Sequence, residues 1–176
     1  DQIKQTFSNF EIFSIFKSNK RLLLFLIKRQ LIIPDSSIVN IFSNPRHQYT
    51  NSKYQNYLLP EIESFLDKSI SKKIKGQISH MLNIRVKNLT ESEQFEEKRK
   101  NGENDGYLCQ LIQNDSIEEF IIHVNKTNLS LKTKIKVSIY ETNRLLLKNE
   151  PSLIEYAAFF GSIQIFQYLK FNKIQI

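Results

Sequence analysis

Apolar residues recur at the spacing of an α-helix along much of the chain, and short polar clusters separate these segments. In the N-terminal part the pattern predicts helices over 10–17, 20–29 and 37–42, and a further helix that begins at Pro60. The polar and aromatic stretch 43–59 is interpreted as a loop, because it lacks this spacing.

The C-terminal part has the clearer pattern. Ser116 and Glu119 have the spacing of a capping box, which predicts a helix from residue 117 onward. A polar, basic connection then follows over 125–150, with a short helix expected at 135–140. Two further helices are predicted over 151–160 and 163–171, separated by a tight turn at Gly161 and Ser162.

The breaker cluster NGENDG at 101–106 suggests a boundary between two regions. We expect an irregular, helical N-terminal region over 1–106, with divergent repeats and a possible linker at 88–106. Residues 107–176 are expected to form helix-pair repeats. Because the chain starts with Asp and ends inside an amphipathic pattern, it is interpreted as a fragment truncated at its C-terminus.

An internal repeat supports helix pairs as the building unit. Residues 111–120 align without gaps with residues 157–166, and residues 15–24 form a third, weaker copy. In each copy an Asp, Gly or Asn stands before the second helix, and these residues tolerate the left-handed backbone conformation. The predicted fold class is therefore all-α, a solenoid of stacked helix pairs.

Residues 152–161 read SLIEYAAFFG and resemble the ankyrin repeat, whose pattern is TPLHxAAxxG. Ala157, Ala158 and Gly161 match this pattern, whereas Leu153 and Glu155 replace its Pro and His. The wider stretch 102–176 resembles divergent ankyrin proteins of some anaerobic protists, whose N-terminal portion is commonly a domain of unknown function.

The resemblance implies a non-catalytic scaffold that binds a partner protein through a concave surface. Exposed aromatic groups on the inner helix would anchor the partner, unless a further repeat covers them. The candidate partner-binding residues are Gln110, Gln113, Asn114, Arg144, Lys148, Asn149, Tyr156, Phe159 and Phe160.

The charge leaves a second function open. The chain carries a formal net charge of +7, and the excess is largest in residues 1–60. A basic helical module that binds nucleic acid or a ribonucleoprotein is the alternative to a protein-binding scaffold. Solvated helix surfaces are the favoured interpretation, because the basic residues do not form one block.

Candidate catalytic and metal-binding groups are few. Cys109 and His123 are the only Cys–His candidates, but the sequence suggests no third group to orient the histidine. His47 and His80 stand in unrelated contexts, so no metal site, cofactor or enzymatic activity is expected. The longest apolar run, 22–27, is too short to span a membrane. A single cysteine fits a reducing, cytoplasmic setting.

Overall fold

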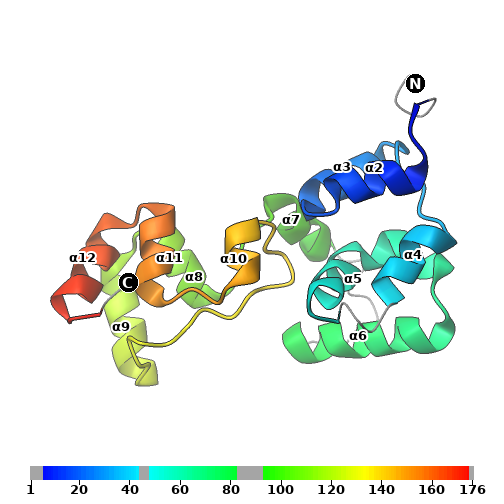
Figure 1. The fold of residues 1–176 in the computed structure, drawn as a ribbon. Helices are drawn as coiled ribbons and strands as arrows, with labels where there is room; N and C mark the ends of the chain where they lie inside the picture. The colour runs from blue at the N-terminus through cyan, green and yellow to red at the C-terminus, as the bar shows by residue number, and fades with distance from the viewer. Residues whose placement is uncertain (1–5, 44–47, 83–92, 175–176) are drawn as a thin grey trace. The chain divides into compact units, whose positions relative to one another are not determined.

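The computed structural model describes residues 6–43, 48–82 and 93–174, and these residues form two compact units (Figure 1). The first unit is Asp1–Gly102 and the second is Glu103–Ile176. The regular structure of the described residues is helical, with one isolated antiparallel bridge between Lys134 and Ser152. The predicted all-α class is confirmed.

The first unit is a cluster of helices around α5. Its elements are α2 (Asn9–Phe16), α3 (Lys20–Lys28), α4 (Ser36–Ser43), α5 (Gln48–Ile62), the 3-10 turn η2 (Glu63–Phe65), α6 (Lys68–Leu82) and α7 (Glu93–Asn101). Helix α5 packs against α3, α4 and α6. The start of α2 is fixed by a capping box between Ser8 and Glu11, and Asn19 caps α3.

Helix α5 corrects the prediction of a loop over 43–59. Tyr57, Leu58, Leu59 and Ile62 are all fully buried. Three of these are consecutive, so the helix is enclosed on more than one side and shows no single apolar stripe. Pro60 lies inside the last turn of α5 rather than at the start of a helix.

Helix α7 occupies part of the possible linker at 88–106. Residues 93–101 form a helix whose side chains at Phe95 and Arg99 are buried. The remainder of the predicted linker before 93 lies outside the described residues. The breaker cluster at 101–106 begins at the last residue of α7, and Gly102 takes a left-handed conformation there, with φ 72°.

The second unit consists of two helix hairpins and the connection between them. Its helices are α8 (Tyr107–Gln113), α9 (Ile117–Thr127), α10 (Arg144–Lys148), α11 (Leu153–Phe160) and α12 (Ile163–Phe171). Helix α8 packs against α11, and α9 packs against α12, so the two hairpins lie side by side (Figure 1). Apolar side chains from both hairpins form one core that includes Ile112, Phe120, Ala157, Ile165 and Leu169.

The connection differs from its prediction in one respect. The short helix expected at 135–140 occurs instead at Arg144–Lys148, where Asn143 caps it. The backbone of the connection is hydrogen-bonded to other parts of the second unit. The amide of Ile135 donates to the carbonyl of Pro151 at 2.7 Å, and the side chain of Asn104 donates to the carbonyl of Lys136 at 2.9 Å.

The internal repeat is a repeat of backbone conformation. Asp115 and Gly161 are both left-handed, with φ 51° and 71°. The following residues, Ser116 (φ −78°, ψ 76°) and Ser162 (φ −76°, ψ 80°), are almost identical in conformation. Residue Asn19, at the corresponding place in the third copy, has φ −125° and caps a helix. The 15–24 segment is therefore not a copy of the same turn.

Candidate functional site

The two hairpins of the second unit are joined at their turns by the carboxylate of Asp115. Its Oδ2 accepts the backbone N–H of Gln164 at 3.0 Å, and its Oδ1 accepts that of Ile165 at 3.0 Å. These two donors belong to the first turn of α12, where the helix has no backbone acceptors of its own. A residue of the first hairpin thus caps a helix of the second.

Ser162 completes this junction in the opposite direction. Its buried hydroxyl donates to the carbonyl of Ile112 in α8. Ser162 therefore does not cap its own helix, although it occupies the N-cap position of α12. Ser116 also makes no side-chain cap, so the capping box predicted for Ser116 and Glu119 is wrong. The capping box of the second unit is formed by Ser152 and Glu155.

A ladder of aromatic rings leads from the core of the second unit to its surface. The buried ring of Tyr156 contacts Phe160 at a centroid distance of 4.7 Å, and Phe160 contacts Phe159 at 5.1 Å. The Tyr156 hydroxyl accepts a hydrogen bond from Nε2 of Gln113 at 2.9 Å. Phe160 is half-buried, and Phe159 is 42% exposed. The exposed ring of Phe159 thus packs on Phe160, which in turn packs on the buried ring of Tyr156.

Tyr156 corrects one expectation for the site, since it is 1% exposed and cannot present its ring to a partner. The side of α11 that carries Tyr156 faces the first hairpin, where Gln113 supplies the polar partner that a buried tyrosine requires. Gln113, Tyr156, Phe160 and Phe159 are therefore brought together in one continuous group.

Four of the other candidate residues lie at the surface. Gln110, Asn114, Arg144 and Asn149 are exposed, and no side-chain bond or ring contact between described residues links them to the aromatic ladder. The side chain of Lys148, at the end of α10, is outside the part of the chain that the structure describes.

Cys109 and His123 do not form a catalytic pair in the structure. Cys109 is buried, and burial raises the pKa of its thiol from 9.0 to about 11. His123 packs its ring edge-on against Tyr107, at a centroid distance of 5.1 Å. A cysteine kept as a thiol is a poor nucleophile, so this residue acts as a small core side chain.

We expect Cys109 to react slowly with a thiol reagent at pH 8. Because its pKa is raised from 9.0 to about 11, its thiolate fraction is about 100-fold lower than that of an ordinary cysteine. Burial adds a steric barrier. Reaction with Ellman's reagent should therefore be at least 100-fold slower in the native protein than in 8 M urea. Equal rates in the two states would contradict a buried, neutral thiol.

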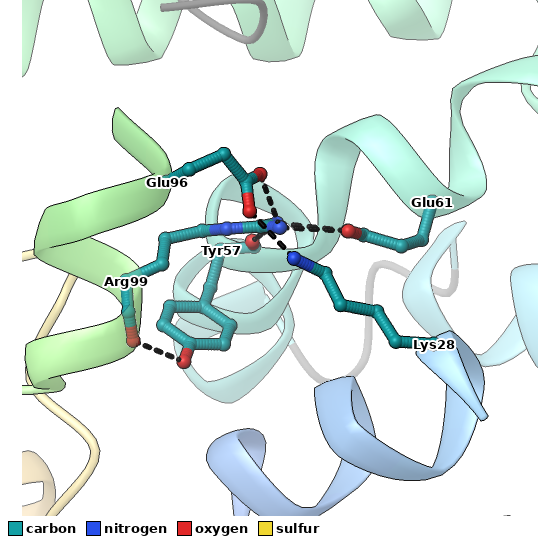
Figure 2. Close-up of polar contacts among 5 residues, drawn as sticks. All are labelled: Lys28, Tyr57, Glu61, Glu96 and Arg99. Carbon is teal, nitrogen blue, oxygen red and sulfur yellow. Dashed lines mark hydrogen bonds and ion pairs between the residues drawn. The ribbon is translucent and has the colours of Figure 1, made fainter. Parts of the chain in front are cut away.

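A second polar cluster lies in the first unit, around the fully buried Arg99 (Figure 2). Its Nη1 donates to the Tyr57 carbonyl at 2.7 Å and to Glu61 at 2.8 Å. Its Nη2 donates to Glu61 at 2.7 Å and to Glu96 at 2.6 Å. In return, the Tyr57 hydroxyl donates to the Arg99 carbonyl at 2.9 Å. These bonds fasten α7 to α5.

The cluster is suited to a structural role. Burial opposes the charge of Arg99, but the hydrogen bonds and charge of Glu61 outweigh it, so its pKa is raised. Burial disfavours the charged form of Tyr57 as well, and for this hydroxyl it raises the pKa to about 12. Glu96 also pairs with Lys28 at 2.6 Å. The guanidinium stays charged and pairs with both carboxylates, so the cluster ties α7 to α5 through buried charged hydrogen bonds.

The sequence did not reveal this cluster, because the charge-dense segment before residue 100 falls in the possible linker at 88–106. Phe95 is its only large apolar residue. Arg99 follows four residues later and so lies on the same face of a helix. That spacing was the available signal that Arg99 is turned toward the core.

Other candidate chemistry adds little within the described ranges. No group of three His, Cys, Asp or Glu side chains there is placed to hold a metal ion. No helix in those ranges combines the length and the apolar character that crossing a bilayer requires. His47, and the side chain of His80, lie outside the described residues.

Comparison of the chain with protein-family models, with curated proteins and with solved structures finds no match. Function is therefore inferred from the residues and their geometry.

Proposed function

We propose that this chain is a non-catalytic protein-binding module, and that its second unit is a pair of ankyrin-like repeats. Two features support the proposal. The hairpins stack in register, α8 on α11 and α9 on α12. The same left-handed turn occurs at Asp115 and at Gly161, at the end of the first helix of each hairpin. Repeated hairpins of this kind build extended surfaces for partner proteins.

The exposed but fixed position of the Phe159 ring is the observation that carries the proposal. Its ring is 42% exposed, yet it is held by Phe160, whose ring rests on the buried Tyr156. Binding costs less when the contacting side chain is already fixed, since little rotamer freedom is lost. Rigid aromatic groups of this kind often dominate the energy of a protein interface. The exposed polar residues Gln110, on α8, and Asn114, which follows α8 as its C-cap, would lie toward the rim of the contact.

The test compares two exposed apolar residues of the second unit. Phe159→Ala removes the proposed anchor, whereas Ile122→Ala removes an apolar side chain that is 64% exposed on α9. We expect Phe159→Ala to weaken a partner's binding by about 2 kcal/mol, or roughly 30-fold, and Ile122→Ala to change it by less than threefold. Affinity capture with the full chain, followed by titration of the captured protein, measures both.

Circular dichroism should show the same helix content for both variants, because both side chains are substantially exposed. A captured protein that binds the wild type and Phe159→Ala equally well would remove Phe159 from the interface and with it the proposed surface.

A further inference from the structure

Helix α3 of the first unit and its C-cap residue, Arg29, carry two arginines and an aromatic ring in a row on the exposed side. Arg21, Phe25 and Arg29 are spaced four residues apart, so they follow one another along the helix surface over about 12 Å. Both arginines are exposed, and the ring of Phe25 is 51% exposed. These three residues are called the α3 row below.

The orientation of the row is fixed by the opposite side of the helix. Leu23, Leu24 and Leu26 are buried in the core of the first unit, and α3 packs against α2 and α5. Lys20 is also buried, with its ammonium group over the rings of Tyr54 and Tyr57, and so does not belong to the row. Burial of these leucines in the core therefore turns the α3 row toward the solvent.

The positive charge of the row is not neutralised within the described residues. Residues 9–29 contain five basic side chains and one acid, Glu11. The carboxylate of Glu11 is engaged with Ser8 at 2.8 Å, and that of Glu96 with Lys28 and Arg99. Neither Arg21 nor Arg29 forms an ion pair with a described residue. Two guanidinium groups thus remain available to an anion.

The two kinds of side chain in the row are coupled. The guanidinium of Arg29 lies over the ring of Phe25, with its carbon 5.5 Å from the ring centroid. This stacking holds a planar cation beside an exposed ring. Guanidinium groups pair well with phosphates, and an exposed ring offers a surface on which a base can stack.

We infer that the α3 row binds single-stranded nucleic acid without sequence preference, with phosphates on Arg21 and Arg29 and a base on Phe25. The charge pattern favours a polyanion. The ring between the two cations favours one with flat apolar groups along its backbone, which a chain of carboxylates lacks. A membrane surface would call for a broader apolar face than the single ring of the row.

The test measures the fluorescence anisotropy of a labelled 20-nucleotide oligo(dT) titrated with the full chain. Binding is expected at 50 mM KCl, with the logarithm of the association constant falling against the logarithm of salt at a slope of about −1.4 for two phosphates. We expect Arg21→Glu/Arg29→Glu to weaken binding at least tenfold, and Phe25→Ala about tenfold, through loss of stacking.

A matched control separates the row from general charge. Lys68 and Lys72 are exposed on α6, which carries no acidic residue, so Lys68→Glu/Lys72→Glu changes the net charge by the same amount. This variant should weaken binding less than threefold. All the substituted side chains are exposed, so circular dichroism should be unchanged.

Three results would overturn the inference. The first is no binding at 50 mM KCl. The second is equal weakening by the α3 and α6 double variants. The third is unchanged affinity in Phe25→Ala together with equally effective competition by poly-glutamate, which would show a site for acidic chains in general.

Discussion

Replacing Arg99 with methionine is expected to lower the free energy of unfolding of the first unit by about 3 kcal/mol. The side chain is fully buried and makes four hydrogen bonds, to Glu61, Glu96 and the carbonyl of Tyr57. Methionine keeps much of the packing volume but leaves the Glu61 carboxylate, whose side chain is only 12% exposed, without its cation. A partly buried charge without a partner is costly.

Urea unfolding of the full chain measures the total change, and hydrogen exchange detected by mass spectrometry assigns it to the first unit. Lys28→Met is the control, because it breaks a pair to Glu96 whose side chains are 51% and 41% exposed. Exposed pairs of this kind contribute between 0 and about 1 kcal/mol. Comparable losses in the two variants would mean that the buried cluster around Arg99 does not hold α7 in place.

The second large effect is expected at Asp115, where alanine should destabilise the second unit by about 1 to 3 kcal/mol. Alanine removes the carboxylate that accepts the backbone N–H groups of Gln164 and Ile165, which is a loss of about 1 to 2 kcal/mol. Asp115 also has φ 51°, and a left-handed conformation is less favourable for alanine than for aspartate by up to about 1 kcal/mol.

Two further variants separate the contributions at Asp115. Asp115→Gly removes the cap but suits the left-handed backbone, and Asp115→Asn tolerates this backbone and keeps one acceptor oxygen. The expected order of stability is wild type, then Asn, then Gly, then Ala. Urea unfolding checks this order. If the glycine variant were as stable as the wild type, the two bonds that the Asp115 carboxylate accepts from α12 would contribute nothing to stability.

The hairpin at the C-terminal side was predictable because its signals are local. Gly161 marks the left-handed turn, and the apolar spacing on either side of it predicts the two helices, all of which the structure confirms. The same spacing placed a helix from residue 117 onward. Local backbone preference and the burial of one helix face indicate the same helices here, so each helix could be predicted from its own segment.

The helix α5 was not predictable in this way. Its tyrosines and asparagines suggested a loop, whereas Tyr57 and Leu58 are completely buried among other helices. A helix enclosed by its neighbours has no polar face to reveal its period. Its stability comes from tertiary packing, which overrides weak intrinsic preference.

The polar junction between the hairpins was missed for a related reason. Ser116 and Glu119 have the spacing of a capping box, but the cap of α12 comes from Asp115, almost fifty residues earlier. Side-chain bonds across that distance in sequence leave no trace in a local motif. The exposure of Tyr156 was misjudged in the same way, because its partner Gln113 belongs to the other hairpin.

The unlike residues at the two equivalent turns make the second unit directional. Asp115 extends a carboxylate to the start of a helix in the neighbouring hairpin, whereas Gly161, in the same backbone conformation, has no side chain to extend. A helix that packs against the second hairpin must therefore cap the N–H groups of its own first turn. Shape and apolar fit around Phe159 then decide which helix packs there.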